Sequence, residues 1–493
     1  MNLPTIVDFK TPVTFEDFKG TGLSRVTFEG LTADQQRCLL ILREHWSANT
    51  GAENFAPFLL SGRPGTGKTT RMIPAFAEML GLHPLMTAPT NEAVKQLEKS
   101  FAAFGVKYTC RTTYQALGLT LVTAGEGRAL VQRKIPESTF EHDVIVVDES
   151  SMASKASKKG NPDLLMDYLI AMCMPVLYVG DWAQLPPVDC VGSESPAWLQ
   201  GFSGYELTEV KRNSGDILSY VERVRAVLED VGNVNKFLPK FSDLPEVHRI
   251  PYKSPEITFA QDNLQLARDI VRGEAVILCW TNKSTKFSRV PGVDDYNKYF
   301  REMAFGSVAS KFKIIVGDQI IFTGMLRIEE GNLVKHLACS FKSLQEGKLK
   351  LAKVASVNTR AKVVKVSNIM HWGIACYRVE LQLDTGANVE VLVVEEKGEV
   401  EYSKKLKFLK ETAKTEIDAR KKHKAWEAVH TFEDSFLNFK YCYAMTTHRA
   451  QGSTLEQVVV QAKNIVQNRD KITRLKCFLV ACSRASKKLY IID

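Results

Sequence analysis

The sequence predicts an α/β protein with two units, each a parallel β-sheet covered by helices on both faces. In two parts of the chain, short apolar runs alternate with segments of helical periodicity, a pattern typical of such sheets. Strands are expected at 58–60, 84–87, 144–147 and 176–179 in the first part, and at 275–280, 441–444, 457–461 and 488–492 in the second.

Two stretches interrupt this alternation. Residues 119–132 place apolar and β-branched residues around a glycine-containing turn, which predicts a β-hairpin. A strand-rich stretch from about 301 predicts a small β-barrel inserted into the second unit, with a charged helical tail near 404–430. The expected domains are an N-terminal extension (1–30), a first core domain (31–205) with the hairpin insert at 117–136, a second core domain (206–300 and 436–493) and an inserted domain (301–435).

Composition sets broad limits on the function. The 493 residues suggest about three domains, and 45% hydrophobic with 25% charged residues is ordinary for a soluble globular protein. The sequence contains no apolar run long enough for a transmembrane helix, and Met1–Gly20 lacks the apolar core of a signal peptide. Ten cysteines without C-x-x-C spacing favour a reducing cytoplasm. We therefore expect a cytoplasmic protein without a membrane partner.

The net charge of +9 suits a polyanionic partner. Basic residues gather in two nearby stretches, 404–410 and 420–424. Either stretch is a solvated helix face or a surface that contacts phosphates, and the sequence leaves both interpretations open.

The most informative stretch is Gly62–Thr69, which matches G-x-x-x-x-G-K-[ST] directly after an apolar run. In a strand–loop–helix context, the glycines let backbone N–H groups face a phosphate, Lys68 reaches the outer phosphates and the Thr69 hydroxyl ligates Mg²⁺. A plain glycine turn before a helix is the alternative. The residues expected to bind the nucleotide here are Gly62, Pro64, Gly65, Thr66, Gly67, Lys68, Thr69 and Thr70.

Two acids, Asp148 and Glu149, end the apolar run 144–147. Carboxylates at the end of a parallel strand lie beside a phosphate loop that follows a neighbouring strand. Asp148 can then hold Mg²⁺ together with Thr69, and Glu149 can orient or deprotonate the attacking water. After the run 176–179, Gln184 can hydrogen-bond the γ-phosphate and sense its loss.

Arg212 and Arg484 are candidate arginine fingers, which stabilise charge on a transferred phosphoryl group from across a domain gap. Taken singly, each also fits a surface ion pair.

The ordered set of motifs resembles the superfamily-one helicases, in the branch of RecD and of the Dda-type helicases of tailed bacteriophages. Leu31–Gln35 resembles the Q motif, in which the glutamine (Gln35) reads adenine. Four further segments resemble motifs that contact single-stranded DNA or open the second core domain, and Val480–Ala485 resembles motif VI. The residues that the resemblance implies at the DNA or the nucleotide are Pro89, Thr90, Asn91, Thr113, Tyr114, Asn282, Thr446, His448 and Gly452. At Tyr114, relatives often carry histidine.

The resemblance implies two RecA-like core domains in tandem, with a duplex-splitting hairpin in the first and an SH3-like barrel in the second that braces it. It also implies ATP and Mg²⁺ as cofactors, single-stranded and forked duplex DNA as partners, and 5′ to 3′ translocation by a monomer. A single-strand-binding protein or another replication protein is a further expected partner, in replication or recombination in a host bacterial cytoplasm. The alternatives are a superfamily-one RNA helicase, an ATP-switched remodeller with little unwinding, and a P-loop kinase.

Overall fold

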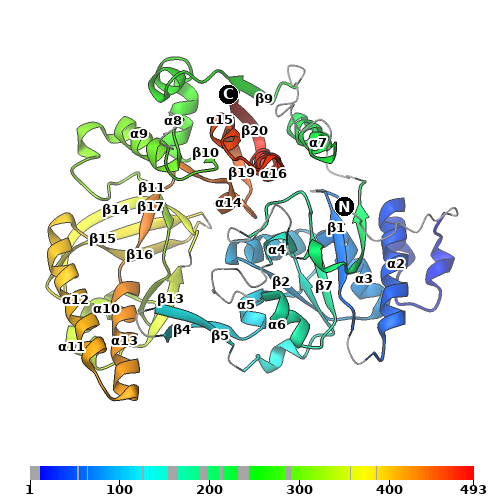
Figure 1. Cartoon of the computed structure of the whole chain (residues 1–493), viewed down its shortest axis with the longest axis horizontal. Coiled ribbons are helices and arrows are strands. Elements are labelled where there is room, and N and C mark those ends of the chain that lie inside the picture. Colours follow the sequence, from blue (N-terminus) through cyan, green and yellow to red (C-terminus); the bar gives the residue numbers. More distant parts are fainter. Residues whose placement is uncertain are drawn as a thin grey trace.

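The computed structural model describes residues 12–493 of the chain, apart from a few short gaps (Figure 1). The gaps are 53–54, 64, 125–126, 133, 154–164, 188–194, 196, 210–214, 231–243, 285–289, 356 and 385. In the part of the chain between these gaps, no helix is both long and apolar enough to cross a lipid bilayer.

The first unit is a six-stranded sheet in the order β3-β2-β6-β7-β1-β8, and all its neighbouring strands are parallel. Alternate side chains of one strand enter two different cores: Phe58 and Leu60 pack on one face, and Leu59 packs on the other. Helices therefore cover both faces, as the sequence predicts. The strands are β1 (Phe58–Gly62), β2 (Pro84–Ala88), β3 (Thr109–Thr112), β6 (Val144–Val147), β7 (Val176–Gly180) and β8 (Ser203–Leu207); the helices are α2 (Ala33–Asn49), α3 (Ile73–Leu80), α4 (Asn91–Ala103), α5 (Thr113–Ala116) and α6 (Leu165–Ala171).

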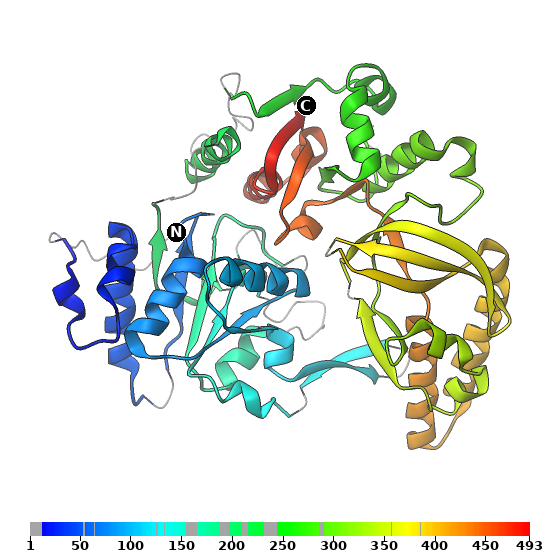
Figure 2. The same cartoon turned by 180° about the vertical axis from the view of Figure 1, so that it is seen from behind.

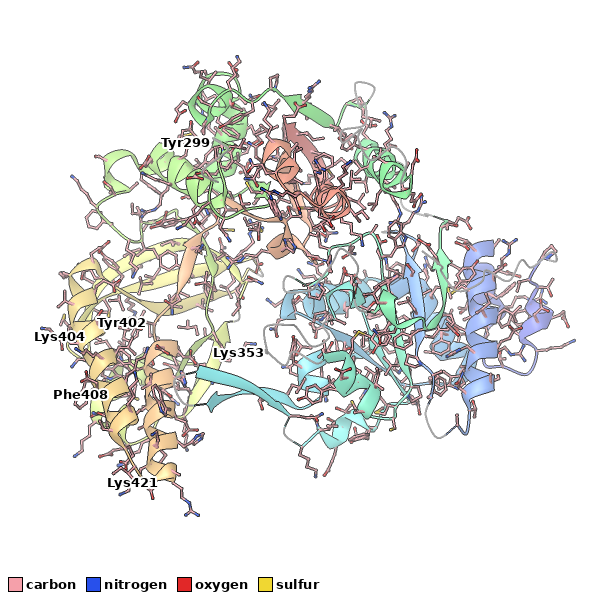
Figure 3. All side chains as sticks on the ribbon, in the orientation of Figure 1. Tyr299, Lys353, Tyr402, Lys404, Phe408 and Lys421 are labelled. Atoms are coloured by element: carbon pink, nitrogen blue, oxygen red, sulfur yellow. The ribbon has the colours of Figure 1, made fainter. Side chains whose placement is uncertain are left out.

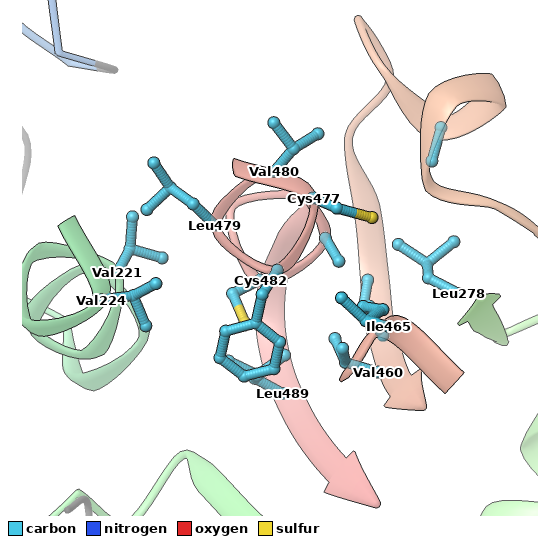
Figure 4. Packing of buried hydrophobic residues seen from close by; sticks show 14 of the residues in the cluster. Val221, Val224, Leu278, Val460, Ile465, Cys477, Leu479, Val480, Cys482 and Leu489 are labelled. Atoms are coloured by element: carbon cyan, nitrogen blue, oxygen red, sulfur yellow. The ribbon is translucent and has the colours of Figure 1, made fainter. Parts of the chain in front are cut away.

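The second unit is a five-stranded parallel sheet in the order β18-β10-β19-β20-β9. One face of this sheet packs against α16, which lies in turn against α7 (Figure 4). The other face packs against α8 and α9. The strands are β9 (Val247–Ile250), β10 (Ala275–Cys279), β18 (Ala444–Thr446), β19 (Leu455–Gln461) and β20 (Ala485–Ile492); the helices are α7 (Asp216–Glu229), α8 (Leu264–Arg272), α9 (Val293–Phe305), α14 (Thr447–Ala450), α15 (Ala462–Val466) and α16 (Lys471–Cys482).

Between β10 and β18 the chain forms a separate antiparallel sheet in the order β16-β15-β14-β11-β17, with a two-stranded ribbon, β12-β13, beside it. The five strands form an open sheet, with β16 and β17 as its two edge strands. Closure of this insert into an SH3-like barrel stays a prediction. The strands are β11 (Gln319–Phe322), β12 (Leu326–Glu329), β13 (Leu351–Ala355), β14 (Arg360–His371), β15 (Ile374–Leu383), β16 (Asn388–Val394) and β17 (Phe439–Tyr441); the helices are α10 (Leu333–Ala338), α11 (Phe341–Gln345), α12 (Glu399–Thr415) and α13 (Ala419–Asp434).

A long antiparallel hairpin leaves the first unit between α5 and β6. Its strands, β4 (Leu119–Ala124) and β5 (Gly127–Gln132), pair along their whole length. Both views show the hairpin reaching across to the insert, where β4 lies against α13 (Figures 1 and 2). The predicted wedge is the insertion near Gly125–Gly127; of these residues, Gly125 and Glu126 lie outside the described residues.

The N-terminal extension, whose sequence predicts no role, packs on the first unit from residue 12 onwards. Phe18, Leu23 and Phe28 are buried in the same core as α2 and α3. The Glu78 carboxylate of α3 accepts hydrogen bonds from the Ser24 backbone N–H at 3.0 Å and the Thr27 hydroxyl at 2.6 Å. The described part of this extension therefore belongs to the first domain.

Two buried histidines of the insert predict a loss of stability in acid. The rings of His336 and His371 lie 5.1 Å apart, and neither Nε2 has a hydrogen-bond partner among the described residues. The His336 Nδ1 accepts a hydrogen bond from the backbone N–H of Glu329 at 3.3 Å. Burial lowers the pKa of His336 to about 4; burial, and then the charge of His336, lowers the pKa of His371 to about 3.

The unfolded chain binds protons on histidine below a pKa of about 6.5, whereas the folded insert binds them only near pH 4 and below. The unfolded state is therefore favoured as the pH falls from 6.5, by about 2 kcal/mol for each histidine at pH 5. As the pH falls from 6.5 to 5, we expect the denaturant concentration at the unfolding midpoint to fall more steeply for the original protein than for His371→Leu. A His423→Leu control removes an exposed histidine and should keep the original slope. Equal slopes for all three proteins would contradict this prediction.

Candidate active site

The phosphate loop follows β1 and opens into a helical turn at Lys68–Met72 that continues into α3. Gly67 has a φ of 73°, in the left-handed region. A Cβ atom on Gly67 would lie 2.8 Å from the Gln35 Nε2. A side chain at this position would therefore strain the backbone and collide with Gln35. Pro64, one of the predicted nucleotide-binding residues, lies outside the described residues.

Gln35 supports the phosphate loop from below. Its Nε2 donates a hydrogen bond to the Thr66 carbonyl at 2.7 Å, and its Oε1 accepts one from the Thr32 backbone N–H at 2.9 Å. Thr32 caps α2 in return by accepting from the Gln35 backbone N–H. Gln35 is buried but still lines the cleft over the loop. The structure therefore gives Gln35 a role in holding the loop, and its contact with adenine stays a prediction.

The predicted catalytic acids lie next to the loop. The Thr69 hydroxyl donates a hydrogen bond to the Asp148 Oδ1 at 3.2 Å, and the Lys68 Nζ donates one to the Arg63 carbonyl at 3.4 Å. Burial raises the pKa of Asp148 to about 7; the charge of Glu149 adds to this shift, and that of Lys68 opposes it. The loop and the two acids thus form one electrostatic unit.

Glu149 is held in an unusual backbone conformation. Its φ of 50° lies in the left-handed region, which is uncommon for a residue with a side chain and clusters at functional sites. Its Oε2 atom is buried and has no hydrogen-bond partner among the described residues, although the side chain lines the cleft. An unsatisfied carboxylate oxygen in that place is suited to accept a proton from a water molecule.

The donor set also fits Mg²⁺. Thr69 and Asp148 present a hydroxyl and a carboxylate 3.2 Å apart in the cleft, and oxygen atoms are the ligands that Mg²⁺ prefers. No group of three or more His, Cys, Asp or Glu side chains that could hold a metal occurs in the part of the chain that the structure describes. A metal held by one or two protein oxygens takes its remaining ligands from phosphates and water.

A cleft of about 610 Å³ brings residues of both units together. Lys68, Thr69, Asp148 and Glu149 line it from the first unit, and Gly452 and Arg484 line it from the second. Arg484 is buried, and its guanidinium donates to the Val480 and Ser453 carbonyls and to the Ser483 hydroxyl. The structure therefore places this candidate finger at the cleft. Arg212, the other candidate, lies outside the described residues.

Gln184 joins the two units at the back of the cleft. Its Oε1 accepts a hydrogen bond from the Gln451 Nε2 at 3.1 Å, and the same Nε2 donates to the Leu185 carbonyl at 3.2 Å. Gln184 comes from the loop after β7, and Gln451 follows α14 in the second unit. Ala183 and Leu185, on either side of Gln184, are buried in the core of the second unit. A change at Gln184 can therefore be passed directly to the other domain.

A buried ion network that sequence reasoning missed lies beside this loop. Arg225 of α7 is 1% exposed, and its guanidinium contacts both carboxylate oxygens of Asp181 at 2.9 Å. It also contacts Glu206 at 3.2 Å and Glu229 at 3.0 Å. Glu229 lies 3.1 Å from Arg63 of the phosphate loop, so this carboxylate bridges two arginines of different domains. Only the i, i+4 spacing of Arg225 and Glu229 on α7 could indicate a pair from the sequence. No spacing indicates Asp181, Glu206 or Arg63, because they come from three other elements.

The residues that the resemblance implies at DNA follow the ends of four parallel strands. Pro89, Thr90 and Asn91 follow β2 and are partly buried; Thr90 caps α4 with its hydroxyl, and the Asn91 Oδ1 accepts from the Lys353 Nζ at 3.5 Å. Tyr114, after β3, is half-buried, whereas the neighbouring Thr113 is fully buried and hydrogen-bonded to Thr87.

The remaining three lie in the second unit. Asn282, after β10, is exposed. Thr446 is buried and caps α14 by accepting from the Arg449 backbone N–H. His448 is partly buried, and burial lowers its pKa, which favours the neutral ring. The hydroxyls of Thr113 and Thr446 therefore shape the loops, and the more accessible residues of the set are left as candidates for direct contact with a strand.

A phosphate loop after β1, a pair of acids after β6, which is separated from β1 by β7, and an arginine from a second parallel sheet define a nucleotide-binding protein with two RecA-like domains. A family model for an AAA domain matches residues 49–231, and one for a UvrD-like helicase C-terminal domain matches residues 441–492. The first match covers most of the first unit and runs on through α7, and the second covers β18, β19 and β20 of the second unit. Together with the RecD2 relative described below, they confirm the resemblance to superfamily-one helicases of the RecD and Dda-type branch.

Two sequence relatives differ in extent. The ATP-dependent RecD2 DNA helicase of Deinococcus radiodurans is 34% identical over 161 residues, which span 32% of this chain and 19% of that protein. An uncharacterized protein of Acanthamoeba polyphaga mimivirus is 24% identical over 480 residues, which span 88% of this chain and 94% of that protein.

Solved Pif1 helicases align along most of the chain at low similarity. The Bacteroides Pif1 helicase in complex with ADP-AlF3 and single-stranded DNA has a TM-score of 0.41 and 14% identity, covering 92% of this chain and 91% of that chain. The Candida albicans Pif1 helicase has a TM-score of 0.38 and 16% identity, covering 94% of both chains.

Proposed function

We propose that the protein is an ATP-dependent DNA helicase that moves 5′ to 3′ along a single strand and unwinds duplex DNA. The observation that supports this most strongly is the cleft in which Lys68, Thr69, Asp148 and Glu149 of one unit face Arg484 of the other. A site divided in this way is completed when the two domains approach each other and is broken when they separate, so that hydrolysis is coupled to relative motion of the domains.

The chemistry follows from the residues of the cleft. Glu149 accepts a proton from a water molecule as the water oxygen forms a bond to the γ-phosphorus and the bond from this phosphorus to the β–γ bridging oxygen breaks. ATP and water thereby become ADP and phosphate. Lys68 and Arg484 balance the charge that spreads over the transferred group. Mg²⁺, held by Thr69 and Asp148, would neutralise phosphate charge when bound.

Movement along a strand requires that loss of the γ-phosphate is sensed by residues that grip DNA. Gln184 lies in the cleft and is hydrogen-bonded to Gln451, which lies three residues after His448. We infer that release of the phosphate shifts this amide pair and thereby the loop with Thr446 and His448. The β4–β5 hairpin is our candidate for the wedge that parts the two strands.

DNA as the substrate is supported by the Deinococcus radiodurans relative, a DNA helicase that matches part of this chain. We further propose a monomer that works in the cytoplasm, alongside a single-strand-binding protein or other replication proteins. The relation to helicases of tailed bacteriophages also stays a prediction.

The test is ATPase activity with and without a short single-stranded DNA oligonucleotide, followed by unwinding of forks with either a 5′ or a 3′ tail. We expect the oligonucleotide to raise kcat at least tenfold and only the 5′-tailed duplex to be unwound. A matched RNA oligonucleotide and RNA fork are the controls for substrate class. Equal ATPase rates with and without DNA, and no strand separation, would contradict the proposal. Faster unwinding of the RNA fork than of the DNA fork would show that RNA, and not DNA, is the substrate.

A further inference from the structure

The helices α12 and α13 form an antiparallel pair that projects from the insert. Its base is fixed, because Leu409, Trp426 and Phe432 are buried in the core of the inserted domain. Its free end, from Lys414 to Lys424, carries mostly exposed side chains; Figure 3 labels Lys421 at this end. The projection therefore presents surface side chains from a rigid support.

Four cations gather at the start of α13. Arg420, Lys421, Lys422 and Lys424, the α13 basic cluster, are all exposed, and no ion pair joins any of them to an acid in the described part of the chain. The spacing of i, i+3 and i+4 places Arg420, Lys421 and Lys424 on adjoining positions of one helix surface. Cations in the first turn of a helix also face the positive end of its dipole, which disfavours them unless an anion is bound.

The lysines of the neighbouring helix behave differently. Lys405 of α12 pairs with Glu401 at 3.3 Å, and Lys410 pairs with Glu433 of α13 at 3.1 Å. The basic stretch on α12 is thus partly neutralised by its own structure, as expected for a solvated helix face. The two basic stretches of the sequence therefore have different surroundings in the structure.

The acids nearest to the α13 basic cluster have other partners. The Glu416 carboxylate accepts hydrogen bonds from two backbone N–H groups, at 3.0 and 3.1 Å. Asp418 caps α13 by accepting from the Lys421 backbone N–H at 2.9 Å. Glu427 lies 3.4 Å from the His423 ring. Their positions are set by these contacts, so the cluster remains open to an external polyanion.

The basic end of the projection and the predicted single-strand path lie on opposite sides of the hairpin. Helix α13 lies against β4 of the hairpin that we propose as the wedge. In Figure 3, Lys353, which contacts Asn91 of the predicted single-strand path, lies on one side of this hairpin, and Lys421 lies on the other. With the hairpin as the point of strand separation, this basic surface would lie on the side of the duplex that has not yet been separated.

We propose that the α13 basic cluster binds backbone phosphates of duplex DNA ahead of the hairpin. This inference rests on the proposed function, because it takes the hairpin as the point of strand separation. A duplex suits the cluster better than a single strand does, since a duplex carries one charge per about 1.7 Å of its axis and keeps its phosphates in fixed positions. The contact would hold the fork against the hairpin without reading sequence.

The experiment compares Lys421→Gln/Lys424→Gln with the control Lys487→Gln/Lys488→Gln, which removes two exposed lysines from β20 of the second unit. Glutamine retains the helix and removes the charge. Equilibrium binding of a 5′-tailed fork and of the single strand alone is measured without nucleotide, across a range of salt concentrations. Each phosphate contact on duplex DNA contributes about −0.9 to the log–log salt slope.

For the fork, we expect the slope of Lys421→Gln/Lys424→Gln to be shallower by about 1.8. The ratio of the fork affinity of the original protein to that of the variant should then fall about tenfold between 50 and 200 mM salt. Binding of the single strand, its stimulation of the ATPase and the behaviour of the control should be unchanged. Lys421→Arg/Lys424→Arg should restore fork binding, which excludes a folding defect as the cause.

Two results would overturn the inference. Fork binding equal to that of the control would show that the cluster does not contact DNA, and an equal loss for fork and single strand would assign it to the single-strand path. Neither result depends on ATP, so unwinding and DNA-stimulated hydrolysis, measured separately, still decide the proposed function. If the original protein showed neither unwinding nor DNA-stimulated hydrolysis, the proposed helicase function would be rejected. If its fork binding still depended on the cluster, the inferred contact with DNA would stand.

Discussion

Replacing Glu149 with glutamine should lower kcat for ATP hydrolysis about a thousandfold while nucleotide binding stays close to its original level. A positioned general base contributes about 10²- to 10⁴-fold to rate, and glutamine keeps the size of the side chain but cannot accept the proton. The carboxylate has a buried oxygen without a partner among the described residues and sits on a left-handed backbone beside Asp148. Rates in single-turnover reactions and the affinity of a fluorescent ATP analogue measure the two effects separately.

Two further variants make this result specific. Lys68→Ala removes the charge that we expect to contact the outer phosphates, so binding and hydrolysis should be lost together. Glu141→Gln makes the same change as Glu149→Gln on an exposed residue just before β6 and should leave both unchanged. Hydrolysis by Glu149→Gln at near the original rate would show that another group takes the proton.

The sequence was sufficient to predict two parallel sheets and the acids beside the phosphate loop, because both depend on local patterns. It did not predict β3, β8 and β9, and the expected strand at 441–444 falls across the end of β17 and the start of β18. Val144–Val147 is fully buried and directly precedes Asp148 and Glu149. A parallel strand that is buried on both faces appears in the sequence as a continuous apolar run, and this run could therefore be recognised. The nucleotide side of the site could be placed because Gly62–Thr69 combines glycines of special conformation with a lysine and a threonine at fixed spacing.

The sequence could not supply contacts between elements that are distant along the chain. Gln184 was a candidate only through its neighbours, and its pairing with Gln451 depends on how two domains dock. Thr113 was predicted to contact single-stranded DNA, but its side chain is fully buried by packing. The packing of Phe18 and Phe28 on the first unit was missed because two separate apolar residues without periodicity give no signal.

Replacing Arg225 with methionine should destabilise the protein by about 3–5 kcal/mol, although methionine fills a similar volume. Arg225 and Asp181 are 1% and 2% exposed in their side chains, and the guanidinium contacts both oxygens of the carboxylate. Removing one partner of a buried ion pair leaves the other charged and desolvated, which costs about this much free energy. The unfolding free energy in denaturant, measured for the original protein and the variant, gives the difference directly.

Arg378→Met is the matched control. Arg378 makes two hydrogen bonds to the Glu390 carboxylate, at 3.0 and 2.8 Å, and the two side chains are 37% and 40% exposed. An exposed pair contributes only about 0–1 kcal/mol, because water solvates each charge when the other is removed. The same substitution should therefore have a small effect there, and equal losses at the two positions would contradict the role of burial.

The expected loss at Arg225 also reaches the cleft, because Glu229 contacts Arg225 at 3.0 Å and Arg63 of the phosphate loop at 3.1 Å. Without Arg225, α7 keeps its packing on α16 in the second unit and loses its buried anchor on Asp181 in the first. Stimulation of the ATPase by DNA should then fall more than the basal rate does.

The double variant Arg225→Met/Asp181→Leu removes both charges of the Arg225–Asp181 pair and should recover part of the stability, whereas the coupling between domains should stay weak. If the double variant regained full stimulation by DNA, packing alone would carry the coupling, and the ion network would have no part in it.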